Sequence, residues 1–289
     1  MNNIQKIINT VLVSTSLFVA SPAVAAQIKI DNDTSSFKNR EIISGAVKVS
    51  VSYVKQENFA DTNSNLQYQI FYNNALQVSS EAYTRFVGTV LLNDLDNDGT
   101  SEVITQTFSG GAHCCTNFTI YTKQNNRFVK LETGLLDGDG GAFQDLDGDK
   151  TFEFVTYDNS FLYTFSSYAG SFAPSLIYAF KNGKFENVTR KYNKLLKSEL
   201  WQMYQAFLKN KKENFEVNGV LAGYVAQKAL LGEYQQGWEF MLANYDRTSD
   251  WGLSIYQGTQ DVGRYSNFPT ALKAFLIKQG YLDKNGRPL

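Results

Sequence analysis

The spacing of apolar positions divides the chain into two parts. Up to about residue 188, short apolar runs rich in β-branched and aromatic residues alternate with turn residues, which predicts strands joined by hairpins. Dipeptides with strong turn chemistry separate such runs at Asn73-Asn74, Asn125-Asn126 and Asn182-Gly183. They recur about every fifty residues, which indicates a weak internal repeat. We expect these units to form a propeller-like β-domain of about three blades or a compact sandwich.

From about Thr189 the apolar period changes to that of helices. One predicted helical face carries five apolar side chains: Leu195, Leu196, Leu200, Tyr204 and Leu208. Three further helices are predicted over residues 220–231, over residues 233–245, and from near Pro269 to Gly280. The fold class that follows is α+β, with a β-domain over residues 27–188 and a small helical bundle over residues 189–289.

The first 26 residues have the pattern of a signal peptide. Lys6 supplies a positive charge, a short apolar stretch covers residues 7–20, and small residues around Ala25 favour cleavage before Gln27. The apolar stretch is shorter than the roughly 18–20 residues that a membrane span needs. We therefore expect a periplasmic or secreted protein with no membrane span after cleavage.

Two short acidic segments carry the clearest chemistry. Residues 94–102 and residues 145–153 both place acids at positions 1, 3, 5 and 9 and both lead into an apolar run. Carboxylates two residues apart repel one another unless a cation lies between them, and Ca²⁺ prefers six to eight oxygen ligands. The predicted ligands are Asp94, Asp96, Asp98, Thr100 and Glu102 in the first segment, and Asp145, Asp147, Asp149, Thr151 and Glu153 in the second. Each threonine would contribute its backbone carbonyl.

An alternative interpretation stays open, because Asp-Asn-Asp-Gly is good turn chemistry without any metal. An EF-hand is not indicated: Thr105 and Thr156 stand where it needs a bidentate glutamate, and strand-forming residues follow each segment.

The pattern Asp-x-Asp-x-Asp-Gly-x-x-Glu before a strand resembles the calcium loop of FG-GAP (VCBS-type) repeats. That family forms propeller blades in integrin α-chains and in secreted bacterial proteins, so the resemblance implies propeller-like blades over roughly residues 60–190. The first segment matches the pattern fully, whereas the second has Lys150 in place of the glycine. The C-terminal third resembles no family.

Residues 109–115 hold both cysteines and the single histidine of the chain. Three interpretations stay open. Cys114 and Cys115 can form a disulfide between neighbours, as two lone cysteines in an oxidising compartment usually pair. They can instead be reduced, buried thiols beside a packed His113. The third interpretation is a functional Cys/His site for a soft metal or a thiol nucleophile.

Composition narrows the function further. The net charge is −1 and the basic residues form no block, which argues against nucleic-acid binding. The standard catalytic and phosphate-binding signatures are missing, and Asp137 and Asp139 read as part of a glycine-rich loop. The favoured hypothesis is an exported, non-enzymatic module with structural calcium that binds an unknown protein or carbohydrate. The alternative is a periplasmic enzyme or a redox or metal protein that uses residues 113–115.

Overall fold

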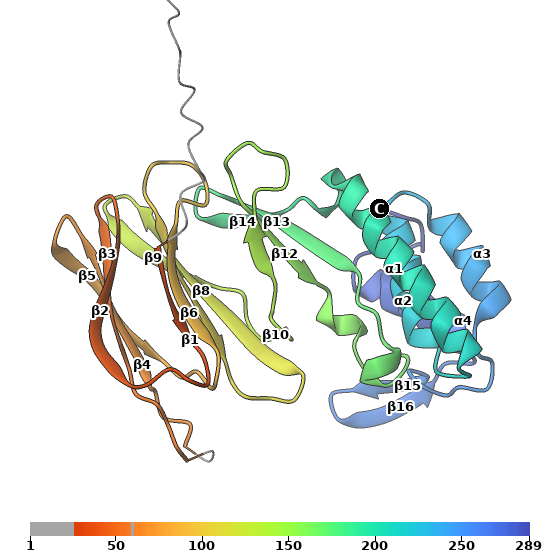
Figure 1. Cartoon of the computed structure of the whole chain (residues 1–289). Coiled ribbons are helices and arrows are strands. Elements are labelled where there is room, and N and C mark those ends of the chain that lie inside the picture. Colours follow the sequence, from red (N-terminus) through yellow and green to blue (C-terminus); the bar gives the residue numbers. More distant parts are fainter. Residues whose placement is uncertain (1–25, 59–60) are drawn as a thin grey trace, which may run out of the picture.

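The computed structural model describes residues 26–58 and 61–289 (Figure 1). The predicted signal peptide therefore lies outside the described residues, except for Ala26, which begins the first strand. The described chain forms three antiparallel sheets in a row, followed by a group of helices (Figure 1).

The first sheet has the strand order β2-β3-β4-β5. Its strands are β2 (Phe37–Ser44), β3 (Val47–Tyr53), β4 (Leu66–Tyr72) and β5 (Ala75–Ala82). The second sheet has the order β1-β6-β7-β8-β10, with β9 paired to β8 as well. Its strands are β1 (Ala26–Ile30), β6 (Gly88–Asn93), β7 (Glu102–Phe108), β8 (Cys114–Gln124), β9 (Arg127–Glu132) and β10 (Leu136–Asp137). The third sheet, β11-β12-β13-β14, comprises β11 (Ala142–Gln144), β12 (Glu153–Tyr157), β13 (Ser175–Lys181) and β14 (Lys184–Asn187).

Strand β7 of the second sheet is buried on both faces over its first half. Successive side chains of a strand point to opposite faces, and on β7 Val103 packs in the core shared with the first sheet while Ile104 packs in the core shared with the third. Both side chains are fully buried. This two-sided burial explains why β7 follows its loop as a continuous apolar run rather than an alternating one.

The helices follow the third sheet through the 3-10 turn η3 (Thr189–Lys191). They are α1 (Asn193–Lys212), α2 (Asn218–Leu230), α3 (Tyr234–Asn244) and α4 (Phe268–Lys278). Helix α4 begins where Asn267 caps it by accepting a hydrogen bond from the Thr270 amide, with Pro269 in its first turn. A hairpin of β15 (Ser254–Gln257) and β16 (Gln260–Arg264) separates α3 from α4, and it was not predicted.

The helical core reaches back into the chain before residue 189. Phe161 and Phe165, near the 3-10 turns η1 (Asn159–Phe161) and η2 (Tyr168–Gly170), are buried among the helices. The fully buried Gln227 of α2 accepts a hydrogen bond from the Ser175 amide on β13 and donates one to the Leu196 carbonyl on α1. The hydrogen bonds of Gln227 therefore join helices α1 and α2 to the third sheet.

The α+β class is confirmed, while the propeller-like arrangement is not, because the three sheets form no closed barrel within the described residues. All three predicted hairpin turns are present, between β4 and β5, β8 and β9, and β13 and β14. Among residues 26–58 and 61–289, helices long and apolar enough to cross a membrane are absent.

Candidate metal centre

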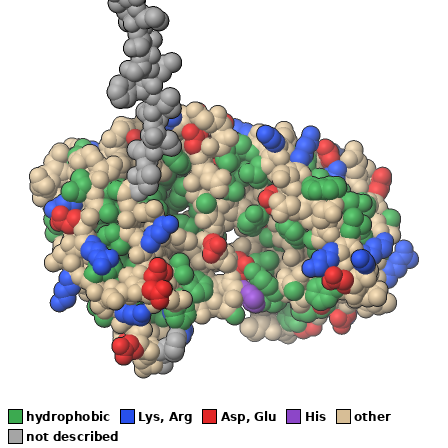
Figure 2. Space-filling model, viewed as in Figure 1, with side chains coloured by type: hydrophobic (Ala, Val, Ile, Leu, Met, Phe, Trp, Pro, Cys, Tyr) green, Lys and Arg blue, Asp and Glu red, His purple; other side chains and the backbone are tan. Residues whose placement is uncertain are grey.

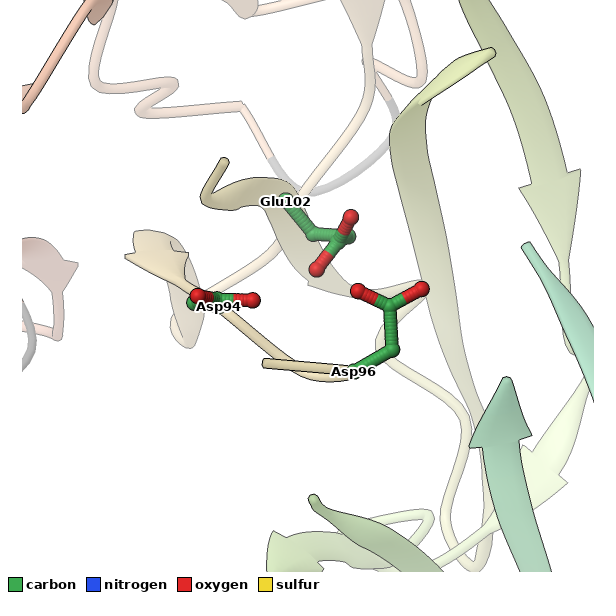
Figure 3. Close-up of side chains that lie close together, drawn as sticks. All are labelled: Asp94, Asp96 and Glu102. Atoms are coloured by element: carbon green, nitrogen blue, oxygen red, sulfur yellow. The ribbon is translucent and has the colours of Figure 1, made fainter. Parts of the chain in front are cut away.

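The first acidic loop connects β6 to β7 and gathers three carboxylates. Oxygens of Asp94, Asp96 and Glu102 lie within 4.8 Å of one another. Figure 3 shows the three side chains around a common space, with Asp94 and Asp96 on the loop and Glu102 at the start of β7. This arrangement offers oxygen ligands to one cation.

Hydrogen bonds within the loop hold these carboxylates in place. Glu102 is buried, and its Oε2 accepts a hydrogen bond from the Leu95 amide at 2.8 Å. Its Oε1 accepts one from the Thr122 hydroxyl at 3.0 Å, which comes from the neighbouring strand β8. Asp94 accepts hydrogen bonds from the amides of Asp98 at 3.1 Å and Gly99 at 2.9 Å. The backbone thus fixes the carboxylates before any ion binds.

The electrostatics of the first loop favour a positive partner. Burial raises the pKa of Glu102 to about 8. Burial, together with the charges of Asp98 and Asp94, also raises the pKa of Asp96. Within the described part of the chain, Asp96 Oδ1 is a buried side-chain oxygen without a hydrogen-bond partner. An ionised carboxylate left in this state is destabilised, and a cation bound between the three acids would relieve it.

The second acidic loop connects β11 to β12 and has the same local design. Oxygens of Asp145, Asp147 and Asp149 lie within 4.8 Å of one another, and all three residues are exposed. The buried Glu153 accepts a hydrogen bond from the Leu146 amide at 3.1 Å, as Glu102 does from Leu95 in the first loop. The second loop is therefore the more solvated of the two candidates.

The backbone conformations of the two loops agree. Asn97 and Gly99 of the first loop have φ of 55° and 86°, and Gly148 and Lys150 at the matching positions have φ of 82° and 72°. Lys150 thus adopts the left-handed region that the first loop assigns to a glycine, at a conformational cost. This residue is the main departure of the second loop from the first.

The two loops adjoin each other. The Phe152 amide in the second loop donates a hydrogen bond to the Leu95 carbonyl in the first at 2.8 Å. Leu95 is fully buried in the core between the second and third sheets, together with Phe154 and Phe180. Both candidate sites therefore lie at the junction of these two sheets.

The structure brings together only part of each predicted ligand set. Asp98 stays outside the first group and Glu153 outside the second. The amides of Thr100 and Thr151 donate to Asp98 and Asp149, each at 2.7 Å.

Sequence reasoning missed two residues that contact the acids from outside the loops. Thr122 donates a hydrogen bond to Glu102. Burial and the neighbouring Glu153 raise the pKa of Tyr192. No local spacing could have revealed them, since both come from distant parts of the chain.

Comparison with known proteins gives the family. The chain is 33% identical over 258 residues to a protein of Synechocystis sp. named "Probable thylakoid lumen protein sll0997", and the alignment covers 85% of this chain and 76% of that protein. The chain belongs to the sll0997 family. Residues 196–280 match the family described as the sll0997 C-terminal domain.

A second relative of this sll0997-family chain is the "Uncharacterized protein y4bJ" of Sinorhizobium fredii. It is 36% identical over 192 residues, which is 63% of this chain and 30% of that protein. No solved structure matches the chain.

The assignment to the FG-GAP (VCBS-type) repeats was wrong. The matches are to the sll0997 family, and they include the helical third, which had resembled no family. An acidic loop of nine residues before a strand is a short local motif, and any turn rich in oxygen ligands can have it. It therefore does not identify a family by itself.

The cysteine motif of this sll0997-family protein lies away from the acidic loops. Cys114 and Cys115 are joined by a disulfide, and the described residues contain no free cysteine. The motif follows the end of β7, whereas the first acidic loop precedes its start at Glu102. The His113 ring stacks on Tyr168 with a centroid distance of 3.9 Å. The motif and the acidic loops therefore form separate sites.

Proposed function

We propose that this protein is an exported binding or interaction module whose two acidic loops hold structural calcium ions. The observation that carries the proposal is the buried, unpartnered Asp96 Oδ1 beside Asp94 and Glu102. The export part rests on the signal-like first 26 residues and on the name of the Synechocystis relative, which places that protein in the thylakoid lumen, outside the cytoplasm.

The donor atoms favour calcium among the common metals. Both groups consist of carboxylates, with neither histidine nor cysteine among them. Oxygen-only sites suit hard cations, whereas zinc and copper take nitrogen or sulfur ligands. Magnesium needs near-ideal octahedral geometry, which a loop with several unevenly placed carboxylates does not favour.

Calcium would fasten the second sheet to the third. Because the Phe152–Leu95 hydrogen bond links the loops, an ion that orders either loop also stabilises the junction of the sheets. At about 1 mM calcium and a dissociation constant of about 10⁻⁴ M, binding one ion to the folded state alone stabilises it by about 1.4 kcal/mol.

The test is thermal unfolding of the mature protein with calcium and with a chelator. We expect calcium to raise Tm in the wild type and Asp96→Asn to lose most of that rise. Without metal, Asp96→Asn should be more stable than the wild type, since it removes a carboxylate whose charged form is disfavoured by partial burial and by the charges of Asp98 and Asp94.

Asp33→Asn is the matched control, because this aspartate is exposed and belongs to neither group of acids. It should keep the full response to calcium. A wild-type Tm that is equal with calcium and with chelator would rule out the structural role.

The second candidate is a redox or metal function of residues 113–115. Its support is a cavity of about 220 Å³ lined by His113, with the Cys114–Cys115 disulfide beside it. Thiols counted in protein from its native compartment separate the candidates. Reactive free thiols, together with an activity that Cys114→Ser removes while the fold is kept, would favour the second candidate.

A further inference from the structure

A cavity of about 680 Å³ opens between the third sheet and helix α1. Its walls come from the loop over residues 137–141, from β11 and β12, from the segment around η1 and η2, and from α1. Figure 2 shows the molecule hollowed near its middle. The volume falls within the range of small-molecule sites, about 300–1,000 Å³.

The charged side chains of the lining are all acidic. Asp137 and Asp139 lie on the loop and Glu199 lies on α1, and the lining contains neither lysine nor arginine. Within the described residues, none of these three carboxylates forms an ion pair. Burial raises the pKa of Glu199, and a positive charge that would stabilise its ionised form is missing from the lining. The cavity is therefore complementary to a cation.

The loop that carries Asp137 and Asp139 is firmly placed. The Thr116 hydroxyl donates to the Gly138 carbonyl at 2.6 Å, and the Thr156 hydroxyl donates to the Gly140 carbonyl at 2.7 Å. These bonds tie the loop to β8 on one side and β12 on the other. The Tyr168 hydroxyl in turn donates to Asp137 Oδ2 at 2.6 Å. The acidic wall is thus built before a ligand arrives, which lowers the ordering cost of binding.

Apolar and aromatic side chains complete the cavity. Tyr157, Leu162, Phe172 and Tyr168 line it together with the acids. Aromatic faces attract ammonium groups, and apolar walls accept methylene chains. Acids on two different walls with apolar surface in the same cavity match a chain that alternates ammonium groups and methylene segments.

We propose that this cavity binds an aliphatic polyamine, with ammonium groups on Asp137, Asp139 and Glu199 and methylene segments on Tyr157, Leu162 and Phe172. The charge of the lining decides between ligand classes. An anion would meet three acids without a positive partner, and a neutral sugar would leave their charge uncompensated. The site is separate from the acidic loops, so it does not depend on the calcium proposal.

The experiment is calorimetric titration of spermidine into the mature, calcium-saturated protein at low ionic strength. Saturating calcium keeps the acidic loops occupied. We expect one binding site whose affinity falls as salt is added, because the attraction is electrostatic and partly solvent-exposed. Triacetylspermidine, which keeps the carbon chain but loses the charges, should give no binding.

Two variants locate the site. Glu199→Gln keeps the side-chain shape and should weaken spermidine binding about tenfold, since it removes one charge partner. Tyr157→Leu should weaken binding about threefold through loss of the aromatic face. Glu213→Gln is the control, an exposed glutamate at the end of the same helix and outside the lining, and it should bind as the wild type does.

Several results with spermidine would overturn the proposal. They are no heat with spermidine, full affinity in Glu199→Gln, and equal weakening in Glu199→Gln and Glu213→Gln. Binding of maltotriose in place of spermidine would likewise assign the cavity to neutral sugars and refute the polyamine.

Discussion

Calcium binding to the first acidic loop should release nearly one proton per ion at neutral pH. Glu102 is only 1% exposed, and its pKa is raised to about 8 by burial. At pH 7 a group with that pKa is about 90% protonated. Calcium binds the ionised carboxylate, so the ion must expel this proton.

The size of the effect follows from the same pKa. Protonation at pH 7 weakens the apparent calcium affinity about elevenfold relative to a fully ionised Glu102, which corresponds to about 1.4 kcal/mol. Raising the pH from 7 to 9 should therefore strengthen binding about tenfold and reduce the proton release to about 0.1 per ion.

Whereas calcium binding should strengthen as the pH rises, the metal-free protein should become less stable. The pKa of Glu102 rises from the model-compound value of 4.5 to about 8 on folding, so the folded state holds more protons in that window. The stability that depends on protonated Glu102 is fully present below about pH 4.5 and is lost as the pH rises toward 8. Calcium should remove most of this loss, because it compensates the carboxylate.

The assay is calorimetry in two buffers that differ in ionisation enthalpy, since the difference in apparent heat gives the number of protons released. Glu186→Gln, an exposed acid on β14, is the control and should release as many protons as the wild type. Proton release near zero at pH 7, or release that does not change between pH 7 and pH 9, would refute the reasoning.

Three further changes test the fold around the sites. Lys150→Gly should stabilise the second loop by roughly 1 kcal/mol and strengthen its calcium binding, because a glycine adopts φ of 72° without cost; calorimetry that finds weaker binding would contradict this. Gln227→Leu should lower the free energy of unfolding in urea by about 2–4 kcal/mol, since it removes the side-chain partner of the Ser175 amide and of the Leu196 carbonyl. Gly223→Ala should cost about 1–3 kcal/mol, because its Cβ would meet the Phe172 carbonyl oxygen; an unchanged denaturation midpoint in either variant would show that the helices do not depend on these contacts.

The hairpins were predictable because their turns are decided locally. Asn73, Asn125 and Asn182 all have positive φ, a conformation that asparagine and glycine accept more readily than other residues. The backbone of the acidic loops is local in the same sense, since Asp94 binds amides four and five residues ahead. The helices were also found to within a few residues, from apolar spacing together with proline and glycine at their ends.

The family was beyond the reach of local reasoning. A motif of nine residues can occur wherever oxygen ligands gather at the start of a strand. Its match to the FG-GAP loops was therefore too short to identify the family. The similarity that identifies the sll0997 family extends over 258 residues and depends on no single motif.

Apolar period, turn residues and clustered acids are properties of neighbours along the chain, and for this protein they were enough to establish an α+β chain with two oxygen-rich loops. Three features join residues that lie 20 to 62 positions apart in the chain. They are the contact between those loops, the hydrogen bond from Thr122 to Glu102, and the cavity that both Asp137 and Glu199 line. Such contacts arise when sheets and helices bury their apolar faces against one another, and many pairings of faces satisfy the same hydrophobic pattern. Only side-chain packing in the folded chain selects one of them.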